Sequence, residues 1–173
     1  MINGDESLLR LVWNPRDFGP GDKLKGSAFS RGDLIPLTDV DGQPKYVSMD
    51  MMSIIDKASV DWNIRKAMGA GKGAAKEKRA EPKFAEFNCG EIRDLSQNGL
   101  DKAFEVIKAP IAEGEDGLNS PENLAHVGVQ SLTPAPNDEV EQNVKVEELR
   151  VLLLASRRTT HSYSDVFGRA MVA

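Results

Sequence analysis

A histidine and an arginine are the residues of this chain whose sequence context most suggests chemistry. His126 lies in the alternating segment AHVGVQ, which predicts a strand with two valines on one face and His126 with Gly128 on the other. Because Gly128 has no side chain, it leaves room beside the imidazole for a cleft or for a packed helix. An imidazole in a cleft can transfer protons if a carboxylate or hydroxyl group lies close to it.

Arg10 lies in the segment LLRLVW, which alternates as a strand and places Arg10 between Leu8 and Val12 on one face. A guanidinium there either reaches a solvent-exposed edge along its apolar stem or is held by a carboxylate or a ligand. Ser48 and Asp50 stand at the start of a helical pattern. Ser48 fits as an N-cap, with a nucleophilic role as the alternative, and Asp50 suits the positive end of the helix dipole.

The elements that must position these residues follow from the spacing of apolar side chains. Alternation predicts strands at residues 8–13, 45–48, 83–92, 102–110 and 124–132. Helical spacing predicts two main helices, Met49–Met68 and Asp138–Arg158. Because the last three strands follow one another with no helix between them, we expect a mostly antiparallel sheet in a single α+β domain, residues 1–158.

The second predicted helix carries clear end signals. Asn137 fits as its N-cap, and Arg157 and Arg158 fall in its last turn, where positive charge suits the helix dipole. The side chains expected to face the core are Val140, Val144, Leu149, Leu152 and Leu153. Residues 159–173 have no clear period and are expected to form a C-terminal tail. An ordered tail needs a surface to pack on, which a partner protein would supply.

Length and composition limit the classes of protein that fit. The chain has 173 residues, of which 40% are hydrophobic and 28% charged, as in one soluble globular domain. Its longest apolar run, VLLLA, is far shorter than the ~20 residues of a membrane span, and acidic residues precede the first apolar stretch, so we expect a cytoplasmic protein. With one cysteine, Cys89, expected as a core residue on a strand, and two histidines, neither a metal nor a cofactor is predicted.

Charge is unevenly distributed along the chain. The net charge is −5, yet residues 64–83 hold seven Lys or Arg and two Glu, a local charge of +5 that leaves −10 on the rest. This basic segment either binds an anionic partner, such as a nucleic-acid backbone, or is a solvated loop. Its glycines lack the spacing of a phosphate-binding P-loop. The candidate contact residues are Arg65, Lys66, Lys72, Lys76, Lys78 and Arg79.

Several stretches stand out together, in this order over about residues 8–130: LLRLVWNPRDF, GSAF, YVSMD, CGEIRDL and NSPENLAHVGV. Together they resemble a family of small uncharacterised bacterial proteins. The family pattern has an Arg strand, an Ala-Phe pair, a Ser-x-Asp segment and a late Ala-His pair. The resemblance implies no activity, but its recurring polar positions correspond to Arg10, Ser48, Asp50 and His126.

A second similarity is to NAD-degrading toxins of the RES type, which also open with an Arg on a strand followed by a Gly-rich loop. Their Gly-x-Pro-x-x-Tyr-like strand resembles GQPKYVS here, which brings in Tyr46. Those toxins need a glutamate on the next helix to stabilise positive charge on the ribose. The segment MDMMSIIDKASVDW contains no Glu, so Asp50 or Asp56 would have to replace it.

The sequence therefore leaves three functional hypotheses. The leading one is a non-enzymatic protein-binding or accessory protein of a bacterial or phage system, of the kind found in defence, immunity or toxin–antitoxin systems. The second is a small NAD- or nucleotide-processing enzyme that uses Arg10, Tyr46 and His126. The third is nucleic-acid backbone binding through residues 64–83. An enzyme would gather the three side chains in one cleft, whereas a binding protein would scatter them.

Overall fold

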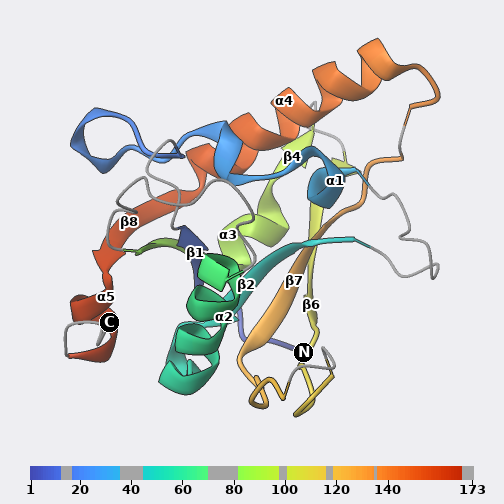
Figure 1. Cartoon of the computed structure of the whole chain (residues 1–173). Helices are drawn as coiled ribbons and strands as arrows, with labels where there is room; N and C mark the ends of the chain where they lie inside the picture. The colour runs from blue at the N-terminus through green and yellow to red at the C-terminus, as the bar shows by residue number, and fades with distance from the viewer. Residues whose placement is uncertain are drawn as a thin grey trace.

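One sheet of six antiparallel strands is the frame of the fold (Figure 1). The computed structural model describes residues 1–12, 17–35, 45–69, 82–97, 101–115, 119–134 and 136–168. The strand order is β6-β7-β2-β1-β3-β8. In chain order the strands are β1 (Ser7–Val12), β2 (Val47–Met51), β3 (Lys83–Asn88), β6 (Phe104–Lys108), β7 (His126–Ser131) and β8 (Arg157–Ser162). Two short strands, β4 (Ser96–Gln97) and β5 (Asp101–Lys102), form a separate pair.

The helices that the structure describes are α1 (Arg31–Leu34), α2 (Lys57–Gly69), α3 (Cys89–Asp94), α4 (Glu139–Ala155) and α5 (Tyr163–Phe167). Single 3-10 turns lie at Pro20–Asp22, Gly26–Ala28 and Met52–Ile54. Of the described helices, only α2 and α4 are long. The predicted α+β class, with a mostly antiparallel sheet and two main helices, is confirmed. No described helix has the length and apolarity that crossing a membrane requires.

The two faces of the sheet carry separate cores, as the alternation in the strands predicts. Leu8 and Phe87 belong to the larger core, which α4 covers through Leu149 and neighbouring apolar side chains. Leu9 and Phe84 point the other way, into a smaller core that contains side chains of α2 and α5. Neighbouring residues of one strand therefore hold helices on opposite sides of the sheet.

The first predicted helix starts too early. Ser48 and Asp50 do not precede a helix but lie in β2, opposite Gly128 and His126 of β7, and the helix α2 begins only at Lys57. The assignment of Ser48 as an N-cap is therefore wrong. Asp56 takes that role, because its Oδ2 accepts a 2.9 Å hydrogen bond from the backbone N–H of Ser59. Pairing with strands on both sides outweighs the helical spacing of the local sequence.

The second predicted helix is correct in place but not at its ends. Asp138, rather than Asn137, is the N-cap, and the helix ends at Ala155. Arg157 and Arg158, predicted in the last turn, lie in β8 and pair with β3. Val140 and Val144 are 69% and 56% exposed, because the first turns of α4 lie beyond the core and only Val146 and later residues face it. Leu149 and Leu153 are buried as expected, and Leu152 packs at the edge of the core.

Cys89 and Gly90 lie in a helix rather than in a strand. The Asn88 side chain accepts from the Glu91 N–H and caps α3, which starts at Cys89. The Gly90 N–H donates to the Gly4 carbonyl at 2.8 Å, and a Cβ on Gly90 would lie 3.0 Å from that same oxygen. Gly90 thus permits a close backbone contact with Gly4. Cys89 is buried in the larger core, as expected.

Residues 159–168, expected in a C-terminal tail, lie within the domain. Residues Thr159 to Ser162 complete the edge strand β8, and α5 follows with a Ser162–Asp165 capping box. The fully buried Tyr163 anchors this segment in the smaller core. The chain's own sheet therefore supplies the surface that orders these residues. Residues 169–173 lie outside the described part of the chain.

Candidate functional site

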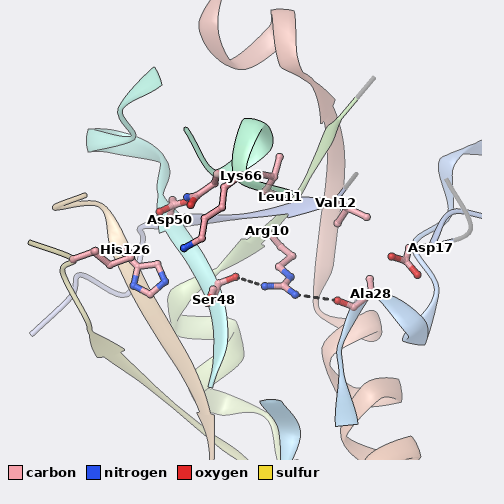
Figure 2. Close-up of a pocket in the computed structure, with 11 residues that line it drawn as sticks. Arg10, Leu11, Val12, Asp17, Ala28, Ser48, Asp50, Lys66 and His126 are labelled. Atoms are coloured by element: carbon pink, nitrogen blue, oxygen red, sulfur yellow. Dashed lines mark hydrogen bonds between the residues drawn. The ribbon is translucent and has the colours of Figure 1, made fainter. Parts of the chain in front are cut away.

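A cavity of about 510 Å³ opens beside β1, β2 and β7, with α2 on one side (Figure 2). On the face of the sheet that carries the smaller core, α2 and α5 pack over β1 and β3. On that same face the strands β2 and β7 carry the polar side chains of Ser48, Asp50 and His126. The cavity is also lined by Leu11, Val12, Ala28 and Ile111. Its polar lining residues are Arg10, Asp17, Ser48, Asp50, Asn63, Lys66 and His126.

Four residues singled out in the sequence meet at this cavity, because their strands are neighbours in the sheet. Asp50 of β2 lies opposite His126 of β7, and Ser48 lies opposite Gly128. On the other side of β2, Asp50 lies opposite Leu9, the residue before Arg10. Segments 10, 48–50 and 126 are far apart in the chain, yet the strand order β7-β2-β1 makes them adjacent.

Arg10 fills the space where β1 and β2 separate. The described pairing of these strands covers Leu8 and Leu9, and beyond it the Arg10 guanidinium donates to the Ser48 carbonyl at 2.8 Å and to the Ala28 carbonyl at 3.2 Å. Its Nε is buried and has no hydrogen-bond partner. Burial lowers the pKa of Arg10, opposed by nearby aspartates, but a guanidinium stays charged at neutral pH. The side chain thus brings a fixed positive charge to the cavity wall.

Asp50 has a buried carboxyl group that is held by an amide. Its Oδ1 accepts a 2.9 Å hydrogen bond from Nδ2 of Asn123, whose own Oδ1 accepts from the Ala125 N–H at 3.1 Å. That second bond fixes which end of the amide faces Asp50. Burial raises the pKa of Asp50, although Asn123, His126 and Arg10 each favour the charged form. A carboxyl group with a raised pKa beside an imidazole is the combination that proton transfer uses.

The His126 ring is fixed in one tautomer by the backbone. Its Nδ1 lies 2.6 Å from the Ala109 carbonyl oxygen, which can only accept, so Nδ1 carries the hydrogen. In the neutral ring Nε2 then holds the lone pair, and His126 lines the cavity. The residue is 7% exposed and lies on the face opposite the larger core, as its place in the alternation predicts.

Tyr46 lies beside these residues but does not line the cavity. Its ring lies against Gly128, and its centroid is 5.7 Å from that of His126. Burial raises the pKa of Tyr46, and the charge of Glu115 adds to the rise. The structure thus brings Arg10, Ser48, Asp50 and His126 to one cavity and places the Tyr46 ring outside its lining, against Gly128 and next to His126.

The predicted basic residues divide into two groups. Lys66 lines the cavity, and Figure 2 shows its side chain extending from α2 toward the side where Asp50 and Ser48 lie. Arg65, its neighbour on α2, is exposed. Lys72, Lys76, Lys78 and Arg79 lie outside the described residues.

Sequence reasoning missed three contributors to this site. Asn123 lies in the same PENLAH segment as His126, and an amide three residues before a candidate histidine was the available signal. Asn63 lies three residues before Lys66, the spacing that puts both on one side of α2. Asp17, which accepts a 2.6 Å hydrogen bond from Ser27, stands in a Gly-rich loop that has no periodicity to read.

No group of three or more His, Cys, Asp or Glu within the described ranges is placed to hold a metal ion. The polar side chains that line the cavity offer a guanidinium, a lysine amine, two carboxyl groups, an imidazole, a hydroxyl group and an amide. No family model, curated protein or solved structure matches the chain. The functional assignment consequently rests on the geometry of the site.

Proposed function

We propose that the cavity is the active site of a small enzyme that binds an anionic small molecule and transfers a proton through His126. The observation that supports this most directly is the meeting of Arg10, Asp50 and His126, from three neighbouring strands, at one 510 Å³ cavity. A protein that used these residues only for packing would have no need to gather them at an open space.

Each residue has a role that follows from its contacts. With Nδ1 bound to Ala109, Nε2 of His126 accepts a proton from a water molecule or hydroxyl group in the cavity. The imidazolium that forms is stabilised by the carboxylate of Asp50 on the neighbouring strand. Arg10 and Lys66 supply the positive charge that attracts an anionic substrate.

NAD is the first substrate to test, because the chain resembles RES-type toxins at Arg10, which lines the cavity; Tyr46, the second point of resemblance, does not line it. In that reaction water attacks the ribose carbon, the bond to nicotinamide breaks, and Nε2 takes the proton of the water. The products are ADP-ribose, nicotinamide and a proton. On this proposal Asp50 supplies the negative charge that the toxins place on a helix, since β2 brings it to the cavity.

The test compares two substitutions of one residue. In His126→Asn the side-chain amide can still donate to the Ala109 carbonyl, but the proton acceptor Nε2 is gone. His126→Ala removes both the donor to Ala109 and the proton acceptor. We expect both variants to lose activity toward NAD or related nucleotides by about 10²- to 10⁴-fold, with His126→Asn keeping the wild-type unfolding midpoint. Wild-type rates in His126→Asn, or no turnover of any nucleotide by the wild-type protein, would overturn the proposal.

Protein binding is a second candidate, and the exposed face of α4 favours it. Val140, Val144 and Val151 are 69%, 56% and 63% exposed, and the last two line a groove of about 700 Å³ with Glu147 and Glu148. An apolar groove with acidic sides fits a basic, amphipathic segment of a partner. Val144→Asp with Val151→Asp should leave stability within about 0.5 kcal/mol and abolish capture of such a partner. Unchanged capture would exclude this surface.

Nucleic-acid binding through residues 64–83 stays a third proposal. Most of its candidate residues lie outside the described part of the chain. Binding to a phosphate backbone would weaken steeply as salt concentration rises. If the protein binds neither DNA nor RNA at low salt, nucleic-acid binding through this segment is excluded.

A further inference from the structure

We propose that Tyr46 is a positioning residue that holds the imidazole of His126 in its active orientation, and that Gly128 is the residue that permits this. The inference rests on the proposed function, because it assigns a role within that site. It also replaces the catalytic role that the sequence suggested for Tyr46, since Tyr46 does not line the cavity.

The contact between Tyr46 and Gly128 is unusually close. A Cβ built on Gly128 would lie 2.6 Å from Cγ of Tyr46 and 2.9 Å from Cδ1 and Cδ2. Real Cβ atoms essentially never approach another heavy atom to within 3.0 Å. Cγ is the base of the ring and not the end of a flexible chain, so an alanine here forces the whole ring to move. Gly128 has no positive φ that would otherwise require glycine.

The ring that occupies this space lies next to His126. Along this face of β7, His126 and Gly128 are successive residues, and Ser48 of β2 lies opposite Gly128. The Tyr46 ring crosses Gly128 and meets the imidazole at an interplanar angle of 55°, with 5.7 Å between centroids. This is the separation at which aromatic pairs attract each other in tilted arrangements.

Two contacts therefore define the orientation of His126. The Ala109 carbonyl binds Nδ1, and Tyr46 lies against the ring. The carbonyl alone fixes one point, about which the imidazole can still tilt. The aromatic contact restricts that tilt, so that Nε2 keeps its direction. Misplacement of a catalytic group by about 1 Å costs up to 10²-fold in rate.

The test uses nitrogen NMR of the histidine rings, which reports the tautomer without any substrate. The chain has two histidines, and His161 lies on β8, hydrogen-bonded to Glu86, so it serves as an internal control. We expect the Nδ1–H tautomer and a single sharp Nε2 signal for His126 in the wild type and in Tyr46→Phe, which keeps the ring. Tyr46→Ala and Gly128→Ala should keep that tautomer, because the Ala109 carbonyl fixes it, but they should broaden and shift the His126 Nε2 signal as the ring tilts and leave the His161 signals unchanged.

A double variant separates positioning from general damage. Gly128→Ala acts by displacing the ring, so adding it to Tyr46→Ala should change the His126 signals no further. Where turnover is measurable, Tyr46→Ala should lower kcat by about 10- to 100-fold with little change in KM, and Tyr46→Phe should restore it. Wild-type His126 signals in both Tyr46→Ala and Gly128→Ala would overturn the inference. Because this readout needs no substrate, it can fail or hold independently of the proposed activity.

Discussion

Asp50 and His126 lie directly opposite one another on β2 and β7, and each is held by a residue of the connection between β6 and β7. Asn123 holds Asp50, while the Ala109 carbonyl holds His126. Ala109 follows β6 and Asn123 precedes β7, so the two anchors belong to the two ends of one connection. This arrangement presents a carboxyl group and an imidazole side by side with little freedom to move.

Substituting Asp50 by Asn should change how stability depends on pH. Because burial raises the pKa of Asp50, the folded state holds this proton more tightly than the unfolded state. The wild type therefore loses stability as pH rises from the ordinary pKa of an aspartate, 3.8, through the raised pKa of Asp50 in the folded protein. Asn lacks this titration but can still accept a hydrogen bond from Asn123. At neutral pH Asp50→Asn should be at least as stable as the wild type, and inactive.

Urea unfolding of both proteins across pH 3 to 8 measures this effect. The advantage of Asp50→Asn should grow as pH rises through that window. Asn123→Ala is the matched control, since it removes the partner and keeps the carboxyl group. A difference between Asp50→Asn and the wild type that is constant with pH would show that Asp50 titrates as it does in water.

Loss of the Arg10 side chain should cost stability because two carbonyl groups depend on it. Arg10→Met keeps the apolar stem and leaves the Ser48 and Ala28 carbonyls without their donor, at a cost of about 1–3 kcal/mol. Arg10→Lys keeps the charge but cannot donate to both carbonyls in the geometry of the guanidinium. Its free energy of unfolding should therefore lie between those of the wild type and Arg10→Met. Denaturant unfolding measures this order. Equal stability of all three proteins would mean that the guanidinium is not held as described.

The C-terminal segment should contribute strongly to stability. Tyr163 is fully buried, and its hydroxyl donates to Asp61 of α2, so α5 is tied to that helix. Tyr163→Ala should destabilise the protein by about 3–5 kcal/mol, and Tyr163→Phe by about 1 kcal/mol. Guanidinium unfolding measures both. A loss below about 0.5 kcal/mol for Tyr163→Ala, the size of a surface effect, would contradict this packing.

Glu86 should give stability with the opposite pH dependence to Asp50. Burial opposes ionisation, yet hydrogen bonds from Ser7 at 2.6 Å and His161 at 2.7 Å hold the pKa of Glu86 below its usual range. Its contribution is therefore present above the ordinary value of 4.5 and is lost as pH falls through the lower folded value. Glu86→Gln should cost about 1 kcal/mol at pH 7 and nothing near pH 2. Thermal unfolding of both proteins between pH 2 and pH 7 measures this difference. A destabilisation by Glu86→Gln that persists at low pH would contradict the lowered pKa of Glu86.

Sequence periodicity predicted the strands well where each strand has two different faces. Leu8 and Leu9 fall in separate cores as the alternation requires, and His126 lies on the face opposite Val127. It found only the first two residues of β2, Val47 and Ser48, because Met51, Ile54 and Ile55 fit a helix as well as a strand. Pairing with β7, some 80 residues later in the chain, decides that case, and no local pattern carries that information.

The site was predictable only in part for a similar reason. Arg10 and His126 were identified from their positions on strands. The partners that define their chemistry are the backbone carbonyls of Ser48, Ala28 and Ala109, which any residue type supplies. Such contacts depend on the fold and leave no mark in the residue types. Gly128 is the exception, since the absence of a side chain did predict a close neighbour, which is Tyr46.

Binding of a nucleotide at His126 is tested most directly by titrating the protein with NAD while following the ring nitrogens of its two histidines by NMR. We expect a saturable shift of the His126 Nε2 signal with no change at His161, which lies outside the cavity. ADP-ribose and inorganic phosphate, titrated in parallel, show which part of the molecule is recognised. If all three ligands leave His126 unchanged, or move both histidines alike, the cavity is not the site of an anion-binding enzyme.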